Sequence, residues 1–221
     1  MPYRRTENVV RRLAEREETI LAAATSIAGE GGMGAVQIAA VAGRANIAAG
    51  TVYRYFPSKT DLVAELVAAI AARELGAMRA AADAAPGPLS ALAASIVTFS
   101  ARALAGRRLA WAVIAEPVDA DVDIVRLDFR QSLAGELATR IRVAILGGHL
   151  PDQDADVAAP AIVGALLEGL IGPLAPLHDE GNAAGGREAV QTVTLLALRA
   201  LGIVDARARG LVAQCVLPRA G

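Results

Sequence analysis

Two runs of aspartates are the first residues in this sequence that could do chemistry, because closely spaced carboxylates can bind a divalent metal. They alternate with other residues: Asp119, Asp121 and Asp123, then Asp152, Asp154 and Asp156. A helix–loop–helix calcium site needs glycine at its sixth position and glutamate at its twelfth. The first run has Ile124 and Arg130 at these positions, and the second has Val157 and Val163. Neither run is a calcium loop of this type, and acidic residues that stabilise a helix start are the simpler interpretation.

Other catalytic side chains are scarce. His149 and His178 have no partner at metal-ligand spacing, and the single cysteine, Cys215, has no activating neighbour. Residues 29–34 match the glycine pattern GxGxxG, but a pyrophosphate site needs a strand before the glycines and a helix after them. Here the glycines follow a long predicted helix, so they read as a helix stop. We expect no enzyme and no cofactor; the alternative is a helical metal-dependent enzyme that uses the run Asp119, Asp121 and Asp123.

Binding to phosphate is the chemistry that the segment 48–59 favours. Ala48, Ala49 and Gly50 leave the backbone almost bare, so that it can approach a flat surface. Side chains that donate hydrogen bonds to DNA phosphates follow directly. They are Thr51, Tyr53, Arg54, Tyr55 and Lys59.

The charge of the chain is unevenly distributed along it. The total of 22 basic and 23 acidic residues gives −1. Residues 1–60 hold eight basic and five acidic side chains, whereas the remainder holds 14 and 18. Such asymmetry is typical of a protein with a nucleic-acid-binding end.

The elements that must position these residues are all predicted to be helices. Alanine and leucine dominate, and strand-like alternation is absent. We expect an all-α fold of about nine helices, near residues 7–28, 36–45, 47–53, 58–82, 89–105, 108–115, 121–146, 154–177 and 187–201. Pro160 and Pro173 should kink the eighth helix or mark its ends.

The two short helices must pack as a helix-turn-helix unit, because neither is stable alone. Asn46 lies between them and tolerates the left-handed backbone that a sharp turn requires. Apolar residues are spaced to form a small core under the pair, namely Ile38, Val41, Ile47 and Val52.

A capping box opens the following long helix, with Ser58 as the N-cap and Asp61 three residues on. We divide the chain into a helix-turn-helix domain at residues 1–62 and a second helical domain at residues 63–221. The helix that starts at Ser58 contributes to both.

The segment also resembles the DNA-binding domain of the TetR (tetracycline-repressor-like) family of transcriptional regulators. Val41-Ala42, the run from Ala45 to Lys59, and Leu62 match the family pattern in register. The resemblance covers about residues 15–65. It implies a recognition helix near residues 47–53 in the major groove of operator DNA, with the preceding helix crossing behind it.

The resemblance also implies roles for individual residues. Thr51, Tyr53 and Tyr55 fall on positions that contact DNA, Lys59 falls on a phosphate contact, and Gln37 and Arg44 lie on the preceding helix. The sequence departs from the family pattern at three positions: Asn46 replaces glycine, Ala48 replaces the serine that caps the recognition helix, and Ala49 replaces a polar residue. The loss of the cap costs about 1 kcal/mol. Alanine methyls can still meet thymine methyls.

Several assignments have alternatives. Tyr53 and Tyr55 could instead pack against the first helix. The arginines Arg4, Arg5, Arg11 and Arg12 could reach the DNA backbone or minor groove, or form a solvated terminus.

The resemblance implies that residues 63–221 form a ligand-binding and dimerisation domain, a helical bundle with a ligand cavity and a two-fold interface. Residues 159–174 and 190–201 are apolar around most of their circumference, and small residues such as Ala161, Gly164 and Gly169 permit close approach. We expect a homodimer through these two C-terminal helices; a wholly intramolecular core is the alternative.

The few aromatic residues suggest where a ligand would bind. The candidate lining residues are Phe99, Trp111, Glu116, Phe129 and Arg130. A tryptophan such as Trp111 in an alanine-rich bundle can equally be core.

Together, these expectations give one hypothesis, that the protein is a cytoplasmic, bacterial, sequence-specific transcriptional regulator. We expect a repressor that a small apolar or amphipathic effector releases from double-stranded operator DNA. A regulator that has lost its effector fits equally well. One cysteine suits a reducing compartment, and no apolar run approaches the roughly 20 uncharged residues of a membrane span.

Overall fold

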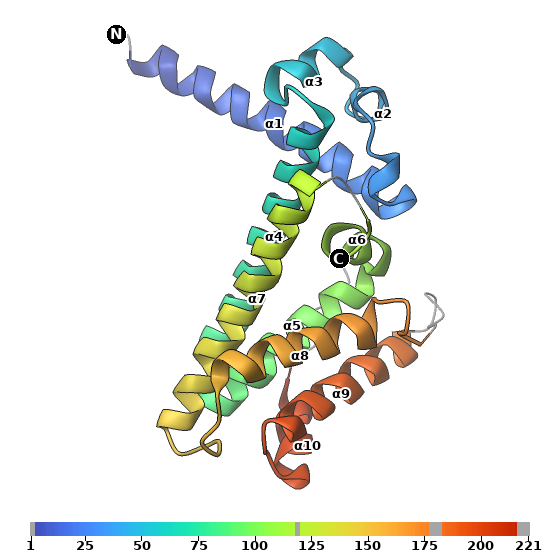
Figure 1. Cartoon of the computed structure of the whole chain (residues 1–221). Coiled ribbons are helices and arrows are strands. Elements are labelled where there is room, and N and C mark those ends of the chain that lie inside the picture. Colours follow the sequence, from blue (N-terminus) through green and yellow to red (C-terminus); the bar gives the residue numbers. More distant parts are fainter. Residues whose placement is uncertain (1–2, 118–119, 177–182, 216–221) are drawn as a thin grey trace.

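Every regular element of the computed structural model is a helix over residues 3–117, 120–176 and 183–215, which are the residues that the structure describes (Figure 1). At residues 3–7 and 183–184 the description is limited to the backbone. The helices are α1 (Tyr3–Gly31), the 3-10 turn η1 (Met33–Ala35), α2 (Ile38–Arg44), α3 (Ala49–Tyr55), α4 (Lys59–Asp83), α5 (Pro88–Ala105), α6 (Arg107–Ile114), α7 (Ala120–Leu146), α8 (Ala155–Leu170), α9 (Ala183–Ala200) and α10 (Asp205–Gln214). The all-α prediction is confirmed.

The molecule has two parts joined by α4. Helices α1, α2 and α3 form a small group around the start of α4, and the first half of α1 projects away from it (Figure 1). The rest of α4 runs beside α7 and packs on α5 in the larger bundle of α5–α10.

The start of α4 follows from its local sequence. The Oγ of Ser58 accepts a hydrogen bond from the Asp61 backbone N–H at 3.1 Å and donates to the Asp61 carboxylate at 2.7 Å. The N-cap role predicted for Ser58 is therefore confirmed, whereas the Asp61 carboxylate accepts from the Ser58 hydroxyl and not, as in a full capping box, from the Ser58 backbone N–H. Leu62 and Val63 are both buried in α4, so the domain boundary predicted between them lies inside a continuous helix.

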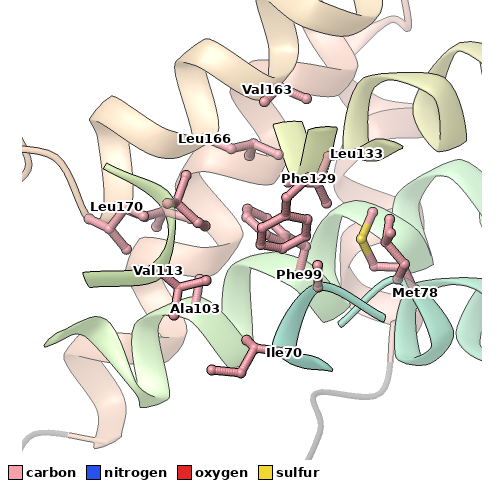
Figure 2. Close-up of a cluster of buried hydrophobic side chains, with 14 of the residues drawn as sticks. Ile70, Met78, Phe99, Ala103, Val113, Phe129, Leu133, Val163, Leu166 and Leu170 are labelled. Carbon is pink, nitrogen blue, oxygen red and sulfur yellow. The ribbon is translucent and has the colours of Figure 1, made fainter. Parts of the chain in front are cut away.

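The core of the larger part is built around α5, which packs against α4, α7 and α9. Figure 2 shows the centre of this core, where Phe99 of α5 and Phe129 of α7 lie among aliphatic side chains of α4 and α8. Helix α5 is the one described helix long and apolar enough to cross a membrane by length and composition. Because 61% of it is buried inside the bundle, the same composition is explained by its place in the core.

Two ion-pair clusters fix α4 to its neighbours. Glu74 of α4 accepts from Arg102 of α5 at 2.9 Å. Burial acts to raise the pKa of Glu74, but hydrogen bonds from Arg102 and Arg73 outweigh it, so the pKa lies below its ordinary value. On the other side, Glu136 of α7 accepts from Arg79 of α4 at 2.9 Å.

The structure differs from the predicted helix boundaries in several places. Helix α1 spans Tyr3–Gly31 rather than residues 7–28, α3 spans Ala49–Tyr55 rather than residues 47–53, and α9 begins at Ala183 rather than near residue 187. Helix α8 ends at Leu170 rather than near residue 177, because Pro173 disfavours helical backbone at Gly172. It continues through Pro160, so this proline does not end it. The tenth helix, α10, was not predicted, because it is short, polar and buries only Ala208, Leu211 and Val212.

Candidate nucleic-acid interface

The turn between α2 and α3 is held by the backbone of the helix end. Asn46 has a φ of 53°, which makes it the one non-glycine residue with positive φ in the described part of the chain. The Ile47 N–H donates to the Ala42 carbonyl at 3.0 Å, and the Asn46 N–H donates to the Gly43 carbonyl at 3.2 Å. This is the Schellman arrangement, in which a left-handed residue ends a helix. The role predicted for Asn46 is confirmed.

Beneath this turn, the two short helices share a small apolar core. Val41 and Val52 are fully buried, Ile38 is buried, and Ile47 is half-buried against the same cluster. These are the four residues that the spacing predicts. Because the core orients both helices, it also fixes which side of α3 faces outward.

The surface of α3 that faces away from this core lies on its first turns. Ala48, Ala49 and Gly50 are exposed, and Tyr53 is 52% exposed. Ala48 is the N-cap and provides no side-chain hydrogen bond, as its residue type predicts. A Cβ at Gly50 would meet no atom within 4 Å. The backbone at this helix start is therefore accessible to an external surface.

The other residues predicted to contact DNA lie around this face, and their side chains differ in exposure. Tyr55 is half-buried and packs on the apolar cluster, whereas Tyr53 is exposed. Thr51 is half-buried, and so is Lys59 at the first turn of α4. Lys59 and Arg54 form no ion pair with residues in the described ranges, so both charges remain available for a phosphate.

Two predicted contacts on α2 have partners within the chain. Gln37 is the N-cap residue of α2, and its side-chain amide donates to the Gly34 carbonyl at 2.9 Å. Arg44 forms a bidentate ion pair with Glu30 of α1, at 2.7 and 2.8 Å, and also donates to Ser26. The hydrogen bonds from Arg44 and Ser26 lower the pKa of Glu30 to about 2. Arg44 therefore ties α2 to α1 in the free protein.

The N-terminal arginines are only partly described. Arg11 and Arg12 are exposed on the projecting half of α1, and Arg11 lies 3.5 Å from Glu15. The side chains of Arg4 and Arg5 lie outside the described residues.

The residues predicted to line a ligand pocket are not brought together. Phe99 and Phe129 meet in the filled core of Figure 2, and each is at most 4% exposed. Trp111 is half-buried on α6, and Arg130 is exposed on α7. A cavity of about 310 Å³ lies elsewhere, between α5, α9 and the end of α10.

Glu116, the fifth of those residues, instead joins the two parts of the molecule. Its carboxylate accepts hydrogen bonds from the backbone N–H of Met33, at 2.9 Å, and of Gly34, at 3.4 Å. Arg126, which is 2% exposed, donates to the carbonyls of Ala112 and Glu116 and so holds the end of α6. A side chain at Gly32 would collide with Glu116, because an added Cβ would lie 2.7 Å from its Oε2. Sequence spacing gives no signal for this contact, since it joins residues 83 positions apart.

The aspartates of the enzyme alternative do not form a described metal site. Asp119 lies outside the described residues, and Asp121 and Asp123 are exposed in the first turn of α7. Asp123 lies 3.6 Å from the Arg126 guanidinium. Over residues 3–117, 120–176 and 183–215, no group of three acidic, histidine or cysteine residues is arranged to hold a metal ion.

Comparisons with known proteins agree with this geometry. Residues 20–66 match the family model of bacterial regulatory proteins of the tetR family. Over 49 residues the chain is 57% identical to the HTH-type transcriptional repressor KstR of Mycobacterium tuberculosis, which is 22% of each chain. It is 52% identical over 54 residues to KstR of Rhodococcus jostii, which is 24% of this chain and 26% of that protein. The matched segment thus spans about a quarter or less of these relatives.

The similarity of fold extends over most of the chain. A structure of RolR in complex with resorcinol has a TM-score of 0.66 at 19% identity, and the match covers 96% of this chain and 100% of that one. FadR from Bacillus subtilis in complex with stearoyl-CoA has a TM-score of 0.70 at 18% identity, with coverage of 85% and 98%. These likenesses show a common fold. Residues 20–66 therefore resemble the tetR family of bacterial regulatory proteins, and most of the chain shares a fold with RolR and FadR.

Proposed function

We propose that this protein is a sequence-specific DNA-binding transcriptional regulator that acts as a repressor in the bacterial cytoplasm. The observation that carries the proposal is the exposed start of α3, where Ala49, Gly50 and Tyr53 face outward from a fixed helix-turn-helix core. The similarity of this segment to KstR, a repressor, supports the direction of regulation.

In this proposal α3 enters the major groove and α2 crosses behind it. Ala48, Ala49 and Gly50 let the backbone approach the base edges, and Tyr53 and Thr51 contact the DNA beside them. Lys59, together with Tyr55 and Gln37, contacts phosphates along the edge of this surface. Arg44 reaches DNA only by giving up its ion pair with Glu30, so we assign it first to the orientation of α2.

We also propose a homodimer through the outer faces of α8 and α9. On α8 the exposed residues Val157, Ala161 and Gly164 follow one face, and a Cβ at Gly164 would meet no atom within 4 Å. On α9 Leu196 is 56% exposed. Small and apolar residues that the described part of the chain leaves exposed fit a two-fold helix interface, which would place two copies of α3 on successive major grooves.

The effector in this proposal is a small molecule bound in the C-terminal part. RolR and FadR, which share the fold, were each solved with a small molecule bound. Glu116 provides a route from that part to the DNA-binding helices, because its carboxylate holds the backbone before α2. An effector that binds one arrangement better shifts the population between DNA-competent and incompetent dimers.

A mobility-shift titration with the DNA upstream of the gene tests the function directly. We expect a specific shift that weakens steeply as salt is raised, because bound phosphates displace counterions. Tyr53→Ala should weaken binding by about tenfold, as expected for the loss of a DNA contact of roughly 1–3 kcal/mol. Leu146→Ala is the control, because Leu146 is 87% exposed at the last residue of α7, the end that lies away from α3 in Figure 1. A protein that gives no salt-sensitive specific shift is not a regulator of this kind.

The oligomeric state tests the interface separately. Analytical ultracentrifugation should show a dimer for the natural protein and a monomer for Gly164→Arg, since the new side chain would bury an unpaired charge. Gly135→Arg, at a similarly open glycine of α7, should leave the dimer intact. A natural protein that sediments as a monomer contradicts the interface.

A further inference from the structure

The cavity between α5, α9 and α10 has an apolar floor and a polar rim. Val97 of α5, Val190 of α9 and Val212 of α10 form the floor and are 2%, 2% and 7% exposed. Arg187 and Gln191 of α9 form the rim and are exposed. Most of the surface that a ligand would meet in this cavity is polar, and the valines lie behind it; small-molecule sites use such convergent polar groups to orient a ligand.

The rim carries one positive charge that the described residues do not neutralise. Arg187 forms no ion pair with any residue in the described ranges. Gln191 lies one helical turn further along α9, so both side chains face the cavity from the same side. A guanidinium with a neighbouring amide donor matches the two oxygens of a carboxylate.

Cys215, at the end of α10, also lines the cavity. Burial raises the pKa of its thiol, so the group stays neutral at neutral pH and does not repel an anion.

We infer that this cavity binds a small organic monocarboxylate, with the carboxylate on Arg187 and Gln191 and the apolar body on the three valines. That the bound acid acts as the effector rests on the proposed function, whereas its binding in this cavity does not. It replaces the pocket around Phe99 and Phe129, where the side chains already fill the space.

The volume limits the size of the acid. About 310 Å³ lies at the lower end of the roughly 300–1,000 Å³ typical of ligand pockets. Monocyclic acids and short straight-chain acids fit this space. Long-chain acids and bulky nucleotide conjugates exceed it, so part of each would project into solvent through the open side of the cavity.

Binding is tested without DNA, on the full-length protein, by thermal shift and calorimetry with benzoate, phenylacetate, cyclohexanecarboxylate, hexanoate and octanoate. At least one acid should raise the Tm in a concentration-dependent way, because a ligand of the folded state stabilises it. The corresponding neutral amide should bind at least about tenfold more weakly, since it lacks the charge that pairs with Arg187. If no acid binds, or if the amides bind equally well, the inference is wrong.

Arg187→Gln tests whether the positive charge of Arg187 binds the carboxylate. It should weaken binding of the acid by about tenfold or more while leaving the amide unaffected. Arg207→Gln is the matched control, because Arg207 is exposed on α10 and outside the cavity. Equal losses in the two variants would indicate a general charge effect and overturn the assignment.

Ala213→Trp tests whether the acid binds in this cavity. Ala213 lines the cavity and is exposed, so a large side chain can fill the space without disturbing the core. Ala206→Trp, two turns earlier on the same face of α10, is its control. Loss of binding only in Ala213→Trp supports the cavity, and unchanged binding in that variant rejects it.

A mobility-shift assay with the acid then separates the two proposals. If the protein binds its DNA and the acid releases it, both are supported. If the acid binds in the cavity but the protein binds no DNA, the site stands and the proposed function fails. If DNA binds and no acid does, only the site fails.

Discussion

Gly50 stands in the first turn of α3, where a β-carbon would meet no atom of the chain within 4 Å. Glycine is costly in a helix, by roughly 0.5–1 kcal/mol relative to alanine, because its backbone loses more freedom on folding. Nothing in the described structure requires that cost. A close external surface explains it, and in the proposed complex that surface is the major groove.

Gly50→Ala should therefore change the stability of the protein and its affinity for DNA in opposite directions. We expect the free energy of unfolding to rise by up to about 0.5 kcal/mol and the affinity for operator DNA to fall, because the added methyl obstructs the approach. Gly76→Ala in α4 is the matched control: that glycine is also exposed with open space around it, so only stability should rise. Urea unfolding and mobility-shift titrations measure the two effects. An unchanged DNA affinity in Gly50→Ala would mean that α3 does not approach DNA through this turn.

At the scale of helices, an ion pair to one carboxylate, Glu30, adds to the apolar packing of α2 on α1. The pKa of Glu30 is about 2, well below its ordinary value of 4.5, because Arg44 and Ser26 donate hydrogen bonds to it. A lowered pKa contributes stability that is fully present above the ordinary value. That contribution is lost as the pH falls from about 4.5 through about 2.

Carboxylate NMR of the full-length protein should thus show Glu30 still ionised at pH 3.5. In Arg44→Gln the pKa should return toward its ordinary value, and α2 should lose protection from hydrogen exchange under the same conditions. Arg54→Gln, which removes a nearby charge that has no described ion pair, should leave Glu30 unaffected. Titration of Glu30 near 4.5 in the natural protein would contradict the ion pair.

The elements that could be predicted from sequence are those set by local interactions. Asn46 at the turn, Ser58 and Asp61 at the start of α4, and the spacing of Val41 and Val52 each act within a few residues of chain. Such signals depend on backbone geometry and periodicity, so they can be recognised in the sequence before the fold is known.

What could not be predicted depends on contacts between distant segments. Arg44 looked like a DNA contact because its partner Glu30 lies on another helix. Glu116 looked like a pocket residue because its partners are backbone amides, which leave no trace in a side-chain pattern. Arg187 and Gln191 face a cavity that exists only once α10, itself too polar to be recognised, has packed on α9.

At the scale of the whole molecule, Glu116 is the polar link between the bundle and the DNA-binding helices. Glu116→Ala leaves the N–H groups of Met33 and Gly34 without this acceptor, and Met33 is buried. We expect unfolding to become easier by about 1–3 kcal/mol, the cost of losing hydrogen bonds to a charged group. Urea unfolding measures this, with Glu65→Ala as the control because Glu65 is exposed on α4. Equal stability of the two variants would show that the contact does not hold the parts together.

The continuous helix α4 has a consequence for how the protein unfolds. Most of its buried residues belong to one apolar cluster that extends from Ile20 in α1 to Val212 in α10, so the cores of the two parts are continuous. The chain carries natural probes for each part: all three tyrosines, Tyr3, Tyr53 and Tyr55, precede α4, and the single tryptophan, Trp111, follows it. Tyrosine absorbance and tryptophan fluorescence should therefore report one shared denaturation midpoint, as a single cooperative unit requires. Two separated midpoints would instead reveal two independently folding domains.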